Sequence, residues 1–243
     1  MSAPCWLLSQ GLVDYAEAWD LQHRAVEARI ASEIPDTLFL LEHPHVYTLG
    51  RSGHAENVLL DAASLAATGA QLFWVDRGGD VTYHGPGQIV GYPIIHLARQ
   101  GKDTHAHLRR IEETIIRTLS DFGLAARRDV EYTGVWVGND KVAAIGVRVS
   151  KWVTSHGFAL NVEPNLSYFE NIVPCGIRGR GVTSLTRLLG RPVTRLEVEP
   201  IILRHFSDVF DVSFGDDREA RKWLADSIVS PEVLGWPVEQ ALG

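Results

Sequence analysis

The sequence predicts an α/β (α+β) domain with a mixed sheet and flanking helices. Two segments, 14–30 and 104–122, carry apolar residues at helical spacings, and Gly123 is placed to end the second. Short apolar runs such as 37–41 and 157–162 stand between and after them, as expected for buried strands. The order of helix, strands, helix, strands and helices indicates an α/β or α+β domain with a mixed sheet.

The remaining elements follow from shorter patterns. Strands are predicted at 37–41, 71–75, 87–95, 133–137, 142–149 and 157–162. Gly91 and Pro93 interrupt the third of these, which indicates an edge strand or a bulge. The run 142–149 alternates poorly, which favours a central strand. Thr194 and Glu197 match a capping box, but Pro200 follows, so one helix and two short helices both remain open.

Composition excludes several classes of protein. The 243 residues fit one domain, 1–243, and the net charge of −7 argues against binding a nucleic-acid backbone. No run approaches roughly 18 apolar residues, so no membrane span is expected. The N-terminus has neither a basic region nor a long apolar stretch, so we expect no signal peptide and a cytoplasmic protein.

Residues 77–88, RGGDVTYHGPGQ, combine four glycines with polar and ionisable side chains. Glycine permits positive φ and close approach of the backbone to a ligand. The exposed N–H groups of such a loop can hold an anion or a carbonyl oxygen. The segment is either a tight hairpin or a binding site, and its polar side chains favour the site.

Cys175 lies between Pro174 and Gly176, a poor setting for a core strand or helix. The nearby Arg178 and Arg180 would favour its thiolate, which is the nucleophilic form. A buried, inert thiol is the alternative, and the local sequence leaves both open. The other cysteine, Cys5, is interpreted as inert; with no CxxC pair, neither a disulfide nor a cysteine-rich zinc site is expected.

A cysteine nucleophile needs a group to accept its proton, and His84, His156 and Lys141 are available. Lys141 enters the apolar run 141–150, so it is either a charged gatekeeper at a sheet edge or a desolvated functional amine. In 155–162, the small residues leave room that an acyl chain or ordinary core packing could fill.

Two His-x-His pairs, His43/His45 and His105/His107, raise the question of a metal site. No Cys, Asp or Glu at ligand spacing completes the first pair, and residues two apart on a helix diverge. We therefore expect no metal.

Four blocks in order resemble the lipoyl(octanoyl) transferase family of lipoate biosynthesis: RGGDVTYHGPGQ at 77–88, KVAAIG at 141–146, HGFALNV at 156–162 and PCGIRGRGVTS at 174–184. The resemblance covers about 37–189, the motif-bearing core, and leaves a C-terminal helical region at about 192–243. It implies the fold shared with biotin and lipoate protein ligases. It also implies that octanoyl passes from octanoyl-acyl carrier protein to a lysine of lipoyl domains, the first step of endogenous protein lipoylation.

The acceptors so implied are the lipoyl domains of 2-oxoacid dehydrogenase E2 subunits and the glycine cleavage H protein, and no cofactor is implied. Cys175 would carry the acyl thioester and Lys141 would be its catalytic partner. The substrate-binding residues carried over are Arg77, Gly78, Gly79, Asp80, Val81, Thr82, Tyr83, His84, Ala144, Ile145, Gly146, Gly157, Phe158 and Ala159.

Two further features are expected if the chain catalyses this acyl transfer. Backbone N–H groups near Gly78, Gly79 or Gly176 could stabilise an oxyanion. Arg148, Arg178 and Arg180 could form a basic patch for an acidic carrier protein. Two alternative functions remain. One is an ATP-dependent lipoate or biotin ligase on the same scaffold, and the other is a noncatalytic binding module for acyl carrier or lipoyl domains.

Overall fold

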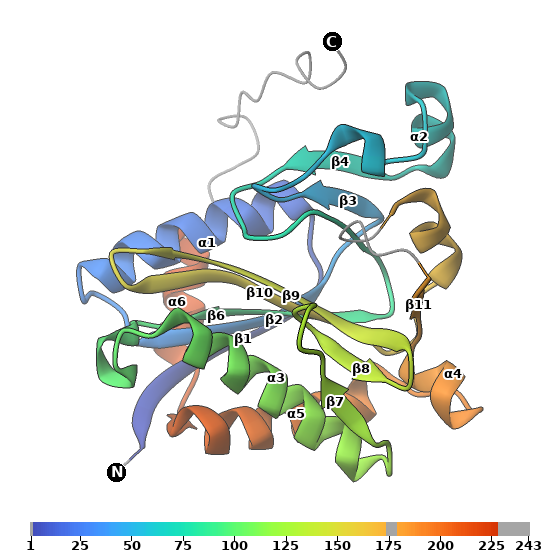
Figure 1. Ribbon diagram of the computed structural model, residues 1–243. Helices are drawn as coiled ribbons and strands as arrows, with labels where there is room; N and C mark the ends of the chain where they lie inside the picture. The colour runs from blue at the N-terminus through green and yellow to red at the C-terminus, as the bar shows by residue number, and fades with distance from the viewer. Residues whose placement is uncertain (1, 174–178, 228–243) are drawn as a thin grey trace.

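A mixed sheet forms the centre of the molecule (Figure 1). The computed structural model describes residues 2–173 and 179–227. The strand order is β12-β1-β2-β6-β10-β9-β8-β7, and β11 pairs with β9. Strands β1, β2 and β12 run parallel, whereas β6, β9 and β10 pair antiparallel. This arrangement confirms the predicted fold class.

The strands of this sheet are β1 (Ala3–Leu12), β2 (Asp36–Glu42), β6 (Gln88–Ile94), β7 (Ala126–Arg128), β8 (Val135–Val137), β9 (Asp140–Ser150), β10 (Val153–Asn161), β11 (Gly181–Val182) and β12 (Val212–Phe214). The helices are α1 (Tyr15–Ile30), α2 (Ala62–Thr68), α3 (Thr104–Asp121), α4 (Leu185–Leu189), α5 (Arg195–Phe210) and α6 (Arg218–Ser227). Three short 3-10 helices are η1 (Ala55–Asn57), η2 (Leu97–Gln100) and η3 (Leu166–Asn171).

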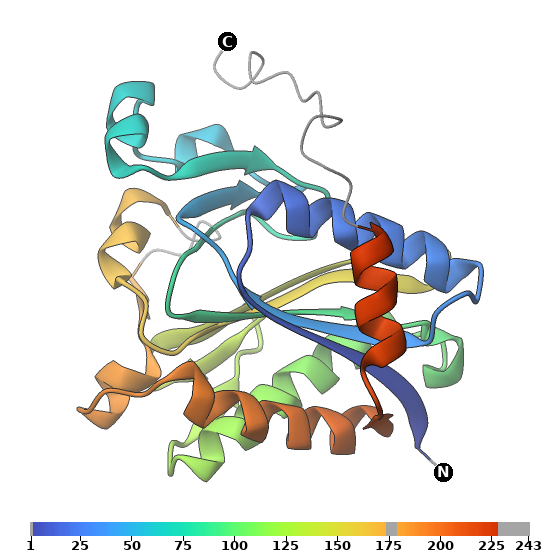
Figure 2. The ribbon, with the colours of Figure 1, turned by 180° about the vertical axis from the view of Figure 1, so that it is seen from behind.

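Helices cover both faces of the sheet, with α1 and α6 on one side and α3 and α5 on the other (Figures 1 and 2). Strand β2 shows why both faces are buried. Leu38 and Leu40 join the core beneath α3 and α5, whereas Phe39 and Leu41 join the core beneath α1 and α6. Because successive side chains of a strand point to opposite faces, an uninterrupted apolar run requires cover on both sides.

A second, three-stranded sheet lies beside the first in the order β4-β3-β5. Its strands are β3 (Val46–Leu49), β4 (Gln71–Trp74) and β5 (Val81–His84). Tyr47, Val81 and Tyr83 pack together in its own small core. Strand β5 leads directly into β6, so the segment 77–88 joins the two sheets.

The expectation of an edge or a bulge at Gly91 and Pro93 is wrong, because β6 lies between β2 and β10 and pairs with β2 through both residues without a register shift. A Cβ on Gly91 would lie 2.3 Å from the ring of Phe158, so the glycine makes room for that ring. The hydroxyl of Thr154 donates to the carbonyl of Pro93 at 2.7 Å and accepts from the Ile95 amide at 2.9 Å. The side chain thus replaces ladder bonds near the proline, which is how an interior strand tolerates it.

Helix α5 settles a question that the sequence left open, and strand β1 was not predicted. The capping box at Thr194 and Glu197 is present, and α5 continues as one helix through Pro200. Strand β1 escaped prediction because its sequence, APCWLLSQGL, lacks regular alternation. Among the described residues, no helix is both long and apolar enough to span a membrane.

His107 on α3 is fully buried, and neither of its ring nitrogens has a hydrogen-bond partner among the described residues. Burial, with Arg110 nearby, lowers its pKa from 6.5 to about 3. The unfolded chain therefore binds a proton below pH 6.5 that the folded protein does not, so acid removes stability.

We expect His107→Leu to raise the free energy of unfolding at neutral pH by about 1–3 kcal/mol, because it removes unsatisfied buried nitrogens. The advantage over wild type should grow by up to about 1.4 kcal/mol per pH unit below the normal histidine pKa. Urea unfolding at several pH values measures both. A pH-independent difference would contradict the explanation, and the same change at exposed His54 serves as the control.

Candidate active site

A cleft of about 520 Å³ lies where the glycine-rich segment crosses strands β9 and β10. Most of the residues expected to bind substrate line it. They are Arg77, Gly78, Gly79, Val81, Thr82 and His84 from the segment before and within β5, Ala144, Ile145 and Gly146 from β9, and Gly157, Phe158 and Ala159 from β10. Lys141 lines it as well, so three of the four sequence blocks meet at one place.

Asp80 and Tyr83 differ from this expectation, because neither lines the cleft. The carboxylate of Asp80 accepts hydrogen bonds from the His54 amide at 3.1 Å and from Asn57 at 2.5 Å, which fixes the loop after β3. Tyr83 alternates with Thr82 along β5 and so joins the core of the small sheet. Its hydroxyl lies 2.7 Å from His45 Nδ1.

Four cleft residues were absent from the expected set: Tyr15, Tyr92, Thr133 and His156. Of these, only His156 had been noted from the sequence, as a possible base. Tyr15 comes from α1, where its spacing indicated only a helix face. No local pattern could have placed it here, because its position depends on how α1 packs on the sheet.

Glycines allow the segment 77–80 to press its backbone against β9. The amide of Gly78 donates to the carbonyl of Val147 at 3.0 Å. A Cβ on Gly146 would lie 2.8 Å from the Gly78 carbonyl, so any side chain there would push the two chains apart. Since the Gly78 amide is already bonded to β9, this amide does not fit the expected role of stabilising an oxyanion, whereas the expectation for Gly79 and Gly176 stays a prediction.

Arg77 is held in the interior by this packing and is only 8% exposed. Its Nη2 donates to the carbonyl of Thr48 at 2.7 Å and to the hydroxyl of Thr48 at 2.9 Å. A guanidinium remains charged at all ordinary pH values. The cleft therefore has a fixed positive charge in its wall.

That charge helps to lower the pKa values of the two histidines in the cleft. Burial, assisted by His43 and Arg77, lowers the pKa of His84 well below its usual value. Burial also lowers the pKa of His156, although Asp76 acts in the opposite direction. Burial therefore favours the neutral form of both rings.

Lys141 is the second residue of β9 and is buried, with 7% of its surface exposed. Because β9 lies between β8 and β10, the alternative of an edge gatekeeper is wrong. Its Nζ lies 4.9 Å from the centre of the Trp136 ring, within the range of a cation–π interaction. A Cβ on Gly134 would approach Lys141 Cε to 3.3 Å, so the backbone there packs on the lysine stem.

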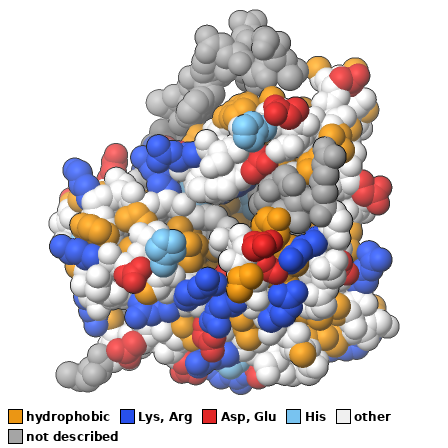
Figure 3. Space-filling view, viewed as in Figure 1, with side chains coloured by type: hydrophobic (Ala, Val, Ile, Leu, Met, Phe, Trp, Pro, Cys, Tyr) orange, Lys and Arg blue, Asp and Glu red, His pale blue; other side chains and the backbone are white. Residues whose placement is uncertain are grey.

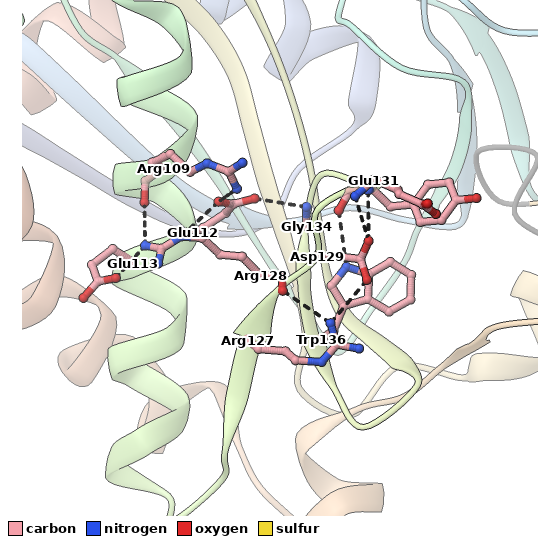
Figure 4. A network of polar contacts seen from close by, with 10 residues as sticks. Arg109, Glu112, Glu113, Arg127, Arg128, Asp129, Glu131, Gly134 and Trp136 are labelled. Atoms are coloured by element: carbon pink, nitrogen blue, oxygen red, sulfur yellow. Dashed lines mark hydrogen bonds and ion pairs between the residues drawn. The ribbon is translucent and has the colours of Figure 1, made fainter.

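A polar network braces the wall beside Lys141 (Figure 4). The buried carboxylate of Glu112 on α3 accepts from Arg109 at 2.7 Å and from the Gly134 amide at 3.4 Å. Asp129 accepts from the amides of residues 131 and 132 and from Arg180 at 2.5 Å. The turn that carries Thr133 and Gly134 is thus tied to α3.

Cys175 lies outside the described residues, as do Gly176 and Arg178. Before this segment, the amide of Val173 donates to the carbonyl of Asn57 at 2.8 Å. After it, the carbonyl of Gly179 accepts from Asn139, two residues before Lys141, at 3.2 Å. The other cysteine, Cys5, is buried, and burial raises its pKa, which agrees with an inert thiol.

The expected basic patch is not formed by Arg148 and Arg180, because each pairs with a carboxylate at a different end of β9. Arg148 pairs with Asp76, and Arg180 pairs with Asp129 beside the start of the strand. Eight residues of strand separate these ends by about 25 Å. On the face seen in Figure 3, Lys and Arg side chains gather instead over the region of α3 and β7.

Residues 14–207 match the family described as "Lipoyl protein ligase A/B catalytic domain". An octanoyltransferase from Rubrobacter xylanophilus is 55% identical over 201 residues, covering 82% of this chain and 90% of that protein. One from Caldicellulosiruptor saccharolyticus is 50% identical over 84% of this chain and 87% of its own length. The chain belongs to the lipoyl(octanoyl) transferase family. As a member of this family, it is an acyltransferase.

Solved structures agree with this family at the level of the fold. A lipoate-protein ligase A bound with ATP has a TM-score of 0.71 at 20% identity, covering 93% of each chain. A putative lipoate protein ligase from T. acidophilum has a TM-score of 0.69 at 19% identity, with the same coverage. The predicted ligase-type scaffold is confirmed.

We expect Gly146→Ala to lower kcat/KM for acyl transfer by at least about tenfold, because the new Cβ displaces the backbone of the glycine-rich segment and with it Arg77. The free energy of unfolding should fall by about 1–3 kcal/mol. Steady-state kinetics and urea unfolding measure the two effects. Gly11→Ala is the control, since a Cβ there meets nothing within 4 Å. A kcat/KM equal to that of wild type would show that the contact between the glycine-rich segment and β9 does not position the site.

Proposed function

We propose that this acyltransferase moves an octanoyl group from octanoyl-acyl carrier protein to the target lysine of lipoyl domains. The acceptors are lipoyl domains of 2-oxoacid dehydrogenases and the glycine cleavage H protein, and the reaction takes place in the cytoplasm. The observation that carries the proposal is the buried Lys141 at one end of a cleft in a chain that is half identical to octanoyltransferases.

The reaction proceeds in two acyl-transfer steps. In the first, the Cys175 thiolate attacks the carbonyl carbon of the donor thioester, and the carrier leaves as its thiol. In the second, the amine of the acceptor lysine attacks the enzyme thioester, forming an amide and releasing the Cys175 thiol. A thioester is already activated, so neither step consumes ATP.

Lys141 is the proposed base for both steps. The Cys175 thiol must lose a proton before it attacks, and the acceptor ammonium must lose one before it becomes nucleophilic. Burial disfavours the charged form of a lysine, which makes its neutral amine more accessible as a proton acceptor.

An ATP-dependent ligase is the main rival, since ligases share the scaffold. The ligase structures named above are at most 20% identical to this chain, whereas the octanoyltransferases named above reach 50–55%. A noncatalytic binding module would not require a buried lysine in the cleft. These observations favour transfer from a thioester over both alternatives.

Incubation with octanoyl-acyl carrier protein without ATP is expected to add one octanoyl group to Cys175, detected by mass spectrometry of the intact protein and its peptides. Cys175→Ala should abolish the adduct. Cys5→Ala is the matched control and should retain it, because Cys5 is buried in the core. An adduct that requires ATP, or none on Cys175 in wild type, would refute the mechanism.

Lys141→Met should shift the pH dependence of Cys175 alkylation by iodoacetamide to higher pH and lower the rate of transfer at least about 100-fold, within the range for loss of a general base. Lys102→Met is the control, since Lys102 also lies over a tryptophan ring, Trp152, but away from the cleft. A thiol profile identical to wild type would eliminate Lys141 as the activating base.

A further inference from the structure

Trp136 lies directly opposite Lys141 on the neighbouring strand. In the antiparallel pair of β8 and β9, Val135 faces Ala143. Regular pairing would then place the next residue, Trp136, opposite Val142. The register shifts at this point, so that Trp136 faces Lys141 instead. Such an extra residue in one strand is a β-bulge, and bulges are over-represented beside active sites, where they re-aim a side chain.

The side chains of this cross-strand pair are in contact. Lys141 Nζ lies over the Trp136 ring, 4.9 Å from its centre. Both residues are buried, Lys141 with 7% and Trp136 with 1% of the surface exposed. The face of an indole ring is negative, and it attracts a cation most strongly where water is excluded. The ring therefore offers the ammonium form of Lys141 a favourable site inside the wall of the cleft.

Several contacts hold the Trp136 ring in this position. Its Nε1 donates to the carbonyl of Tyr132 at 3.4 Å. Arg180 Cζ lies 4.9 Å from the centre of the same ring and 5.1 Å from the centre of the Tyr132 ring. Asp129 accepts from Arg180 at 2.5 Å. The ring is thus fixed by the network that also ties the neighbouring turn to α3.

A buried base must still be able to take up a proton. Burial disfavours the ammonium and so weakens a lysine as a proton acceptor. A carboxylate next to Lys141 would reverse this effect, but it would hold the lysine in the charged form. The two buried carboxylates of this wall, Glu112 and Asp129, are each shared by two arginines. An uncharged ring stabilises the ammonium to a smaller extent, so that the proton can be both accepted and released.

We propose that Trp136 is a positioning residue that sets the proton affinity of Lys141 through this contact. The inference rests on the proposed role of Lys141 as a base, and it adds the group that offsets the effect of burial. When Lys141 takes the proton of the Cys175 thiol, an N–H bond forms as the S–H bond breaks. The ring stabilises the ammonium so formed, and Trp136 itself neither gains nor loses a proton.

Other charged and titratable side chains on the elements around Lys141 are the same whichever ring stands opposite the lysine. They include Arg77, His84, Glu112, Glu131, Tyr132 and Arg180. Arg180 needs its own control, because it contacts the same ring and a positive charge favours a thiolate. Each ring is therefore compared with and without Lys141.

The test places tryptophan with one, two or three ring fluorines at Trp136, which weakens the negative face of the ring with little change in shape. The readout is the pH dependence of Cys175 alkylation by iodoacetamide, followed by mass spectrometry of the Cys175 peptide. Each fluorine should move the midpoint to higher pH, by up to about one unit in total, because a less stable ammonium supports less thiolate. The rate of octanoyl transfer at neutral pH should fall in the same order.

In Lys141→Met, fluorination of Trp136 should leave the midpoint of that variant unchanged, and Lys141→Gln serves if the methionine variant does not fold. Fluorination of Trp152, which lies 5.6 Å from Lys102 and away from the cleft, is the matched control and should change nothing. A midpoint that does not respond to fluorination of Trp136 would overturn the inference, as would equal shifts with and without Lys141. A Lys141→Met profile identical to that of wild type would instead refute the proposed base.

Discussion

Backbone-to-backbone contact at glycine positions is the constraint on which the cleft depends. A Cβ on Gly50 would lie 2.3 Å from the Gly79 carbonyl, one on Gly146 would lie 2.8 Å from the Gly78 carbonyl, and one on Gly157 would lie 2.2 Å from the Gly91 carbonyl. At all three places two chain segments touch without room for a side chain. The glycine-rich segment can therefore lie flat on the sheet, and Arg77 enters the interior as a result.

The distribution of charge inside the site depends on the close packing at these glycines. Arg77 is a buried cation, and it acts with burial to lower the pKa values of His84 and His156. Negative charge is kept at the far end, on Asp76. Burial alone would raise the pKa of Asp76, but hydrogen bonds from His156 and His23 hold it well below its usual value. Positive charge thus stands in the wall of the cleft at Arg77, and negative charge stands behind His156 on Asp76, which also pairs with Arg148.

The sequence predicted what depends on local pattern and missed what depends on packing between distant segments. The helix periodicity of 104–122 and the apolar run of 37–41 place α3 and β2 correctly, because both patterns reflect burial that any fold must satisfy. The prediction drawn from Pro93 was wrong because the hydroxyl that replaces the ladder bonds lost near the proline belongs to Thr154, far along the chain. Tyr15 could not have been assigned to the cleft from its neighbours, nor Glu112 to the turn beside Lys141, because α1 and α3 reach these places only through the tertiary fold.

The scaffold alone does not decide between transfer and ligation, since a ligase bound with ATP has the same fold. Both chemistries need an acyl group with an activated carbonyl next to an amine. A ligase must create that activation from a nucleotide, whereas a thioester donor already carries it. A transferase that works in the two proposed steps instead needs a group on the enzyme that holds the acyl chain after the carrier leaves. In this chain Cys175 is proposed for that role, so the proposed difference in chemistry rests on one thiol.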